Sequence, residues 1–429
     1  MKKIFYCLVA AFVLAACVKE DASIAKVEEV KNPYAVTPDE AVQLLKTVIG
    51  GESTRAVSVG EIKTLRKSDF VPITRGAEDG DVIYIVDLEN GGCAVMGADK
   101  RMEPIYAILD ETKISPEKLT LTATRSDDGE EDIEEFVMGL MNAKISSDFA
   151  ALRPPLIDTL PIPSLRSEFW NETTTLGQRS PMLRTKWDQE DPYNNVIAMH
   201  TGNPDTHASC VTIAMAQLMA YHQTNMRGTN YNWNIINSFT PGYVDIASDG
   251  EITYLANYIF EIRRAIKDSD YDNPNIPLPY ITDFMSDELR YNNVSSYLNY
   301  NRGEIVSMLN NNLPVCVDGE TYVTREDGST YIGGHSWLID GYNYYKIDEW
   351  ERSYFGEFID EERIIATYYY DLMHCNYGWE GKCDGYYSSG IFNPSIRLNP
   401  ERIDTSIGDK SGTEPYNFNI NLYYFKYSI

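Results

Sequence analysis

Positive charge is scarce in this sequence. Its 429 residues contain 37 Lys and Arg against 64 Asp and Glu, a formal net charge of −27 at neutral pH. Proteins that bind nucleic acid through phosphate contacts need clustered Lys and Arg. The composition therefore argues against a nucleic-acid partner. Strong acidity favours instead a soluble protein that works outside the cytoplasm.

Long apolar runs are also scarce. Only the first residues carry one: Lys2 and Lys3 precede the apolar stretch 4–14, which is too short to span a bilayer comfortably. Two alanines and Cys17 follow, a pattern that resembles a bacterial lipoprotein signal over residues 1–16. The alternative is an ordinary secretory signal with an accidental cysteine. The lipoprotein pattern implies that Cys17 is lipidated and that residues 17–32 tether the protein to a membrane.

Such an anchor implies a place in a bacterial cell envelope, outside the cytoplasm, at the outer membrane or the cell surface. The sequence leaves open which membrane face carries the protein and whether processing releases it.

Cysteine is rare outside this leader. The seven cysteines are Cys7, Cys17, Cys93, Cys210, Cys316, Cys375 and Cys383. The five after the leader are scattered and odd in number, which excludes a disulfide scaffold. Cys375 and Cys383 flank a turn and can pair in an oxidising compartment. With His374 they also suggest a metal site, but the spacing is poor and a fourth ligand is missing, so we expect no metal.

Helix and strand signals predict a small α+β unit over residues 33–145. The run Thr37-Pro38-Asp39-Glu40 forms a capping box with proline at the first helical position, and Gly50 ends the helix it opens. Strand-like runs at 82–88 and 93–98 follow, joined by a turn. Residues 146–186 then combine five prolines with arginines, which predicts an exposed, extended linker. Exposed linkers are where proteases cut.

Residues 187–429 contain helical patterns first and strand patterns later, as in an α+β domain. The helices are predicted around Cys210, through 255–266 and near 303–310. The strands are predicted at 314–317, 336–342, 364–377 and 417–428. The acidic stretch 342–370 between two strands predicts a hairpin.

Cys210 opens a helix whose apolar stripe continues through residues 211, 214, 215, 218 and 219. The helix dipole at that position favours the thiolate, which is the nucleophilic form of cysteine. His335 precedes an apolar strand 125 residues later. A cysteine and a histidine that the fold brings together are the arrangement of a cysteine hydrolase, although singly each residue type is more often structural.

The other histidines are weaker candidates. His200 and His207 precede the Cys210 helix and are expected at a cleft rim. His222 lies three turns beyond Cys210, too far to act on it at 1.5 Å per residue. His374, in a strand, is expected to be structural.

Four blocks carry a resemblance to a known family. They are Trp187–Asn194, Cys210–His222, Gly334–Gly341 and Asn376–Tyr387, and they resemble, in this order, the streptopain family of bacterial cysteine peptidases. The run Tyr84–Pro104 is similar to the inhibitory propeptide of that family. The resemblance implies a papain-like peptidase domain over 187–429, with a helical part and an antiparallel sheet part, behind an inhibitory propeptide domain over 33–145.

The resemblance also implies roles for five residues. Cys210 attacks the scissile carbonyl, and His335 holds its thiolate as an ion pair and later protonates the leaving amine. Asn376 accepts the other imidazole N–H, and Trp379 covers that contact. The Gln189 amide and the Cys210 backbone N–H form the oxyanion hole. Such covalent catalysis needs no metal and no organic cofactor, but it needs a reducing environment that keeps Cys210 a thiol.

Two residues depart from the family pattern: Tyr377 stands where tryptophan is usual and Glu380 where glycine is usual. We expect them to change specificity. The sequence as a whole predicts a secreted, lipid-anchored zymogen of a cysteine endopeptidase. Its partners would be protein or peptide substrates and its own propeptide, which a cut in 146–186 removes. The alternatives are a catalytically silent adhesin or inhibitor-like protein on a peptidase scaffold, and an amidase or transglutaminase with the same chemistry.

Overall fold

A computed structural model describes the parts of the chain on which the site depends. The described residues are 32, 34–50, 58–70, 79–89, 91–119, 133–152, 165–266, 276–324, 330–355, 358–392 and 421–429. The chain divides into two compact units, Met1–Ala35 and Val36–Ile429. The predicted leader and the lipidation site Cys17 lie outside the described residues, as does most of the tether. Within the described residues no helix has the length and apolar character needed to cross a bilayer.

The N-terminal α+β elements are present. They are α2 (Pro38–Ile49), β1 (Val59–Arg66), α3 (Lys67–Phe70), β2 (Asp81–Leu88), β3 (Cys93–Gly97), β4 (Ile105–Leu109), α4 (Pro116–Leu119) and α5 (Ile133–Ala151). The capping box of α2 is confirmed: the Glu40 N–H donates to Thr37 Oγ1, and the Thr37 N–H donates to Glu40 Oε2 at 2.7 Å. Both predicted strands are confirmed as β2 and β3.

The segment expected to be an extended linker contains regular structure. Residues 146–151 continue α5, and residues 165–179 form strand β5 (Leu165–Arg179), which pairs antiparallel with β8 along its whole length. These residues are therefore a helix end and a strand and not a linker, although β5 is extended and its described side chains are exposed or half-buried, as expected. The proline-free run between Pro163 and Pro181 contains aromatic and threonine residues that favour a strand.

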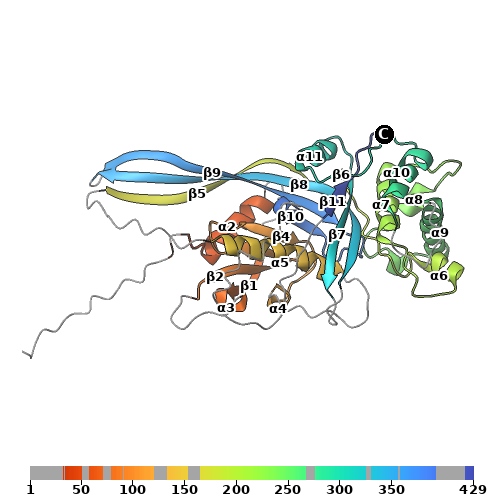
Figure 1. The fold of residues 1–429 in the computed structure, drawn as a ribbon, viewed down its shortest axis with the longest axis horizontal. Helices are drawn as coiled ribbons and strands as arrows, with labels where there is room; N and C mark the ends of the chain where they lie inside the picture. The colour runs from red at the N-terminus through yellow and green to blue at the C-terminus, as the bar shows by residue number, and fades with distance from the viewer. Residues whose placement is uncertain are drawn as a thin grey trace, which may run out of the picture. The chain divides into compact units, whose positions relative to one another are not determined.

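The helical part of the C-terminal region follows β5. It contains α6 (Asn195–Thr201), α7 (Cys210–His222), α8 (Trp233–Ile236), the 3-10 turn η1 (Val244–Ile246), α9 (Asp249–Ala265), α10 (Leu278–Asp283) and the π-helical turn η2 (Phe284–Glu288). These elements gather at one end of the sheet, on the right in Figure 1. Helix α7 is buried all round, with ten buried residues from Val211 to Ala220, so it is the central helix of this part.

The strands that follow complete an antiparallel sheet. They are β6 (Leu298–Asn299), β7 (Val315–Thr324), β8 (Thr330–Phe355), β9 (Phe358–Asn376), β10 (Gly385–Ser388) and β11 (Asn421–Tyr424), with α11 (Arg302–Asn310) and the 3-10 turn η3 (Ser389–Phe392) among them. The strand order is β1-β2-β3-β4-β10-β9-β8-β7-β11-β6. Helices together with an antiparallel sheet confirm the α+β prediction.

One sheet thus joins the N-terminal strands to the C-terminal ones. The joint is the pairing of β4 with β10, in which Leu109 lies opposite Gly385 and Ala107 opposite Tyr387. A Cβ at Gly385 would lie 2.3 Å from the Ile108 carbonyl oxygen, so only glycine permits this approach. Whether 33–145 is a separate domain stays a prediction, because residues 36–429 form one compact unit.

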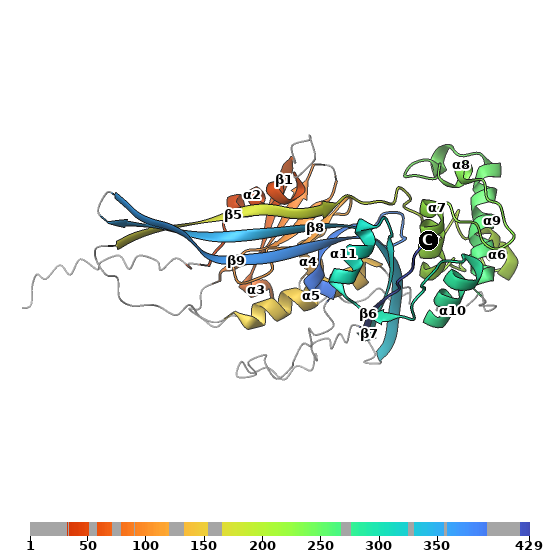
Figure 2. The ribbon, with the colours of Figure 1, turned by 90° about the horizontal axis from the view of Figure 1, so that it is seen from above.

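A three-stranded arm continues beyond the body of the sheet. Strands β8 and β9 form the hairpin expected at 342–370, and β5 adds a third strand on the other edge of β8. Figures 1 and 2 show this ribbon extending past the helices of the N-terminal part. Trp170 of β5 and Trp350 of β8 stack at 5.8 Å on one face of it.

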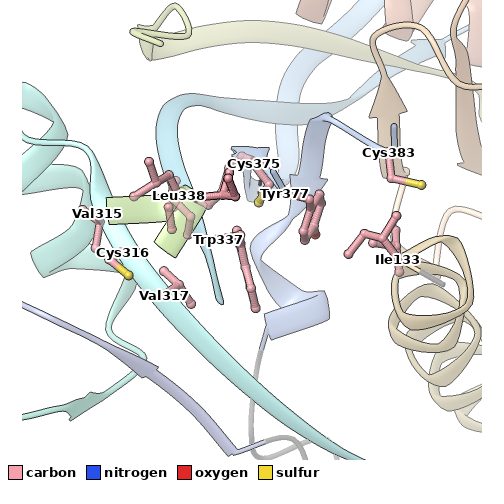
Figure 3. Packing of buried hydrophobic residues seen from close by; sticks show 14 of the residues in the cluster. Ile133, Val315, Cys316, Val317, Trp337, Leu338, Cys375, Tyr377 and Cys383 are labelled. Carbon is pink, nitrogen blue, oxygen red and sulfur yellow. Dashed lines mark hydrogen bonds between the residues drawn. The ribbon is translucent and has the colours of Figure 1, made fainter. Parts of the chain in front are cut away.

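A large apolar cluster connects the two parts of the fold. It contains residues of β2–β4 and α5 together with residues of α7, α9 and β7–β10. Figure 3 shows a portion of it, with Ile133 at the start of α5 drawn beside the C-terminal residues Tyr377 and Cys383. Because the cluster is shared, N-terminal residues lie next to the candidate active site.

Candidate active site

Cys210 is the first residue of the buried helix α7, as the sequence predicts. Ser209 caps the helix: its hydroxyl accepts the Thr212 N–H at 3.3 Å, and its φ of 75° lies in the left-handed region that few non-glycine residues adopt. Such strained backbone concentrates at functional sites. Cys210 is half-buried between the fully buried Ser209 and Val211. No disulfide joins the cysteines that the structure describes after the leader, including Cys375 and Cys383.

His335 lies on β8 and is buried, with 6% of its surface exposed. Its Nε2 lies 2.8 Å from the carbonyl oxygen of Tyr377, so this nitrogen carries the proton and donates it to the carbonyl. The ring stacks on Trp337 at 6.3 Å and lies 6.0 Å from the ring of Phe136 on α5. Burial lowers the pKa of His335 to about 4, against a smaller upward effect of the Tyr377 carbonyl.

The surroundings of His335 thus favour the neutral form of its imidazole. A thiolate–imidazolium pair would need the charged ring, which these surroundings disfavour. Phe136 belongs to the N-terminal part, and its contact with the ring is one source of the burial.

Asn376 ends β9, one residue before the carbonyl that holds His335. Its Oδ1 accepts the Gln217 Nε2–H at 2.9 Å and the Gly378 N–H at 3.2 Å, and its Nδ2 donates to the Thr185 carbonyl at 2.8 Å. The side chain is thus fixed next to His335 but bonds to other groups. Its role as acceptor of the imidazole N–H stays a prediction for the active form.

Gln189 and the loop before Cys210 are joined through the backbone. The Ala208 N–H donates to the Gln189 carbonyl at 2.8 Å, and the Gln189 N–H donates to Asp188 Oδ1 at 2.6 Å. Gln189 is buried, with 5% exposed. The predicted oxyanion-hole residue therefore lies beside the segment that leads into the nucleophile.

Trp379 forms a wall of a cavity of about 310 Å³. Its ring lies 6.5 Å from that of His335 and 6.5 Å from that of His207, which agrees with the expectation that His207 lies at a cleft rim. Glu380 adopts a left-handed φ of 52°, a conformation that suits the glycine usual in the family. The cavity is lined by Glu111, Thr112, Asp188, Trp379, Glu380, Gly381 and Lys382.

The carboxyl of Asp188 faces this cavity. Burial is the main cause that raises its pKa to about 6, the Glu190 and Glu380 carboxylates add to it, and the Gln189 N–H opposes it. A carboxyl of this kind in a cleft is typical of functional sites.

Two polar residues that position the site were not predicted. Gln217, fully buried in α7, donates to Asn376 and accepts the Trp187 N–H at 3.4 Å, so it joins three of the four family blocks. Asp384 accepts the Tyr377 N–H at 2.8 Å and so holds the residue whose carbonyl binds His335. The signal for Gln217 was present: it is a lone amide in an apolar helix, two turns after Cys210.

His374 lies in a network of charges. Its Nδ1 lies 2.6 Å from Asp340 Oδ1, and its Nε2 lies 3.3 Å from Asp110 Oδ2, an N-terminal carboxylate. Burial alone would lower its pKa, but the Asp340 and Asp110 carboxylates raise it to about 10. Within the described ranges no group of three or more His, Cys, Asp or Glu side chains is placed to hold a metal ion.

Comparison with known proteins places these residues in a family region. Residues 187–387 match the model of the Peptidase C10 family. A solved fragment of prointerpain A from Prevotella intermedia, with a cysteine-to-alanine substitution, is 15% identical, with a TM-score of 0.45 over 85% of this chain and 98% of its own. Active wild-type interpain A cysteine protease of that organism is 18% identical, with a TM-score of 0.37 over 58% of this chain and 94% of its own. No curated protein matches.

All five predicted site residues lie within the matched region. The resemblance found in the sequence is therefore confirmed there: residues 187–387 match the Peptidase C10 family, the streptopain family of cysteine peptidases.

Proposed function

We propose that the protein is the zymogen of a cysteine endopeptidase and that residues before β5 keep it latent. The observation that carries the proposal is the double contact of His335, with the Tyr377 carbonyl on one side and Phe136 of α5 on the other. A neutral, buried imidazole cannot stabilise the Cys210 thiolate as its ion partner. Removal of α5 would expose the ring to solvent, and its pKa would return toward the ordinary range.

The activating cut is expected before Leu165. Strand β5 pairs with β8 from Leu165 opposite Phe355 to Arg179 opposite Tyr342, so it would remain with the enzyme after the cut. The enzyme would then begin with β5 and retain Gln189, Cys210, His335, Asn376 and Trp379 in their predicted roles.

The test compares the wild-type chain with Cys210→Ala in the presence of a reductant and a protein substrate. We expect the wild type to shorten and to digest the substrate, and the variant to do neither. Amino-terminal sequencing of the product should find a start before Leu165. If the wild type remains inactive even after trypsin has removed its N-terminal part, the silent binding scaffold becomes the better explanation.

An endopeptidase is distinguished from an amidase or a transglutaminase by the products that each forms from a protein substrate. An endopeptidase cleaves internal peptide bonds of casein, whereas the alternatives release ammonia or cross-link glutamine side chains without shortening the chain. Mass spectrometry of the products separates these outcomes.

Anchoring by a lipid on Cys17 belongs to the same proposal and is supported by the leader pattern alone. Growth of an expressing bacterium with labelled palmitate should label the wild-type chain but not Cys17→Ser. The predicted place in the envelope, outside the cytoplasm, is tested by fractionation of the same cells. Label on both chains, or on neither, would favour the ordinary secretory signal.

A further inference from the structure

Strand β10 has two neighbours, and only one of them would remain after activation. On one edge it pairs with β9, which belongs to the enzyme. On the other edge it pairs with β4, and the residues after β4 extend the contact: the Asp110 N–H donates to the Asp384 carbonyl at 3.0 Å, and the Cys383 N–H donates to Thr112 Oγ1 at 2.9 Å. Loss of residues 105–112 would open a row of backbone donors and acceptors along β10.

The contact between this N-terminal segment and the enzyme is also complementary in charge. Lys186 Nζ lies 3.1 Å from Glu111 Oε1 and 3.9 Å from Asp110 Oδ2. His374 Nε2 lies 3.3 Å from the same Asp110 oxygen. In each pair the N-terminal part supplies the carboxylate and the enzyme supplies the cation, although the whole chain carries an excess of negative charge.

We propose that the edge of β10, with Lys186 and His374 beside it, binds an extended acidic segment of the substrate protein once residues 105–112 have left. Addition of a strand to an open sheet edge supplies backbone hydrogen bonds, and the flanking cations select acidic side chains. The inference rests on the proposed function, because the edge opens only if activation removes the N-terminal part.

The path of the departing segment leads to the candidate active site. After β4, Glu111 and Thr112 form two walls of the cavity that Trp379 borders. A substrate segment on β10 would therefore continue into the cavity beside Trp379, whose ring lies 6.5 Å from that of His335. The cavity is also lined by Asp188 and Glu380, so the acidic residues of the substrate are expected where Asp110 and Glu111 lie, beside Lys186, and away from these two carboxylates.

A second copy of the enzyme fits this edge less well. A second copy would bring the same edge, with Lys186 and His374 beside it, and would offer these cations no carboxylate in place of Asp110 and Glu111. An acidic segment of another protein places opposite charges there instead.

The test uses enzyme that the full chain has produced by processing, with Cys210 then alkylated. The probe is a fluorescent peptide with the sequence of residues 104–112, and its matched control carries Asp110→Asn and Glu111→Gln. Anisotropy at low salt should show that the control peptide binds about tenfold more weakly than the acidic peptide, since several partly buried ion pairs are lost. Enzyme with Lys186→Gln should lose most of this difference. Enzyme with Lys346→Gln, on the arm, should keep it.

Three results would separate the possibilities. If non-alkylated processed enzyme hydrolyses no short peptide, the proposed function fails and not merely this inference. If it hydrolyses short peptides but binds both probes equally, or neither, the acidic-segment inference is overturned. Sedimentation that shows a dimer of the processed enzyme, together with no probe binding, assigns the edge to a second copy and also overturns it. Because the two probes differ only in the peptide, the comparison does not depend on the folding of the Lys186→Gln enzyme.

Discussion

His335 and His374 lie on the neighbouring strands β8 and β9, and both are buried, yet their surroundings change their pKa in opposite directions. His335 has aromatic rings and one carbonyl around it, and burial lowers its pKa to about 4. His374 lies between Asp340 and Asp110, whose carboxylates outweigh burial and raise its pKa to about 10. Burial therefore does not decide the charge of a histidine; the presence of a carboxylate partner does.

The comparison also separates two ways in which the N-terminal part affects the enzyme. Through Phe136 it covers the predicted catalytic histidine with an apolar ring. Through Asp110 it supplies charge to a histidine that has no predicted catalytic role. The Phe136 contact would therefore affect catalysis, and the Asp110 contact would affect how firmly the N-terminal part is held on the enzyme.

The largest effect is expected from His374→Gln. The change removes the cation between two carboxylates and leaves Asp340 buried without its charge partner, which costs about 3–5 kcal/mol of unfolding free energy. Urea denaturation of the full chain measures the loss. Adding Asp340→Asn should restore part of the stability, and a double variant no more stable than His374→Gln would show that the ion pair is not the cause.

The two histidines should also give opposite pH dependences. The raised pKa of His374 stabilises the fold fully below the unfolded value of about 6.5, and this contribution is lost as pH rises from there through 10. The lowered pKa of His335 contributes above about 6.5 and is lost as pH falls toward 4. NMR titration of the imidazole protons tests both, and a His335 midpoint near its ordinary value would contradict its burial.

A smaller effect is expected from Phe136→Ala, which removes a half-buried ring from His335. Stability should fall by about 1–3 kcal/mol, less than for a fully buried ring, and the pKa of His335 should rise as water reaches the imidazole. The matched control is Phe149→Ala on the same helix, whose ring lies 6.2 Å from Phe70 and not beside His335. If both variants shift the His335 titration equally, the effect comes from loosening of α5 and not from the contact.

The smallest effect is expected from Arg363→Ala on the arm. Arg363 Nη2 lies 2.9 Å from Glu351 Oε2, but the arginine side chain is 57% exposed and solvent screens the pair. The melting temperature should stay within the scatter of repeated measurements. A clear drop would mean that charge pairs matter on the arm as they do around His374.

Much of the fold followed from local signals in the sequence. The capping box placed the start of α2, the apolar stripe placed α7, and the strand-like runs on either side of a turn placed β2 and β3. The resemblance of four blocks identified the five candidate site residues within the region that the family model matches. These features depend on residues that are near one another in the chain.

The features that were missed depend on distant partners. Strand β5 is stabilised by pairing with β8, which lies far along the chain. Prolines on both sides of β5 made the whole segment resemble a linker, although its aromatic and threonine residues favour a strand. The contact of Phe136 with His335 joins residues that no local pattern relates. The choice of the Tyr377 carbonyl over the Asn376 amide as partner of His335 depends on Gln217 and Thr185, which already occupy that amide.

Strand β5 also bears on whether a molecule activates itself or is activated by a neighbouring copy. It has 15 residues, and at about 3.3 Å per residue a bond just before Leu165 lies roughly 50 Å along the arm from Arg179. A molecule could bring that bond to its own Cys210 only by peeling β5 away from β8. Cleavage by a neighbouring molecule needs no such disruption, so the proposed activation should follow second-order kinetics, slow in dilute solution and self-accelerating where many copies share a surface.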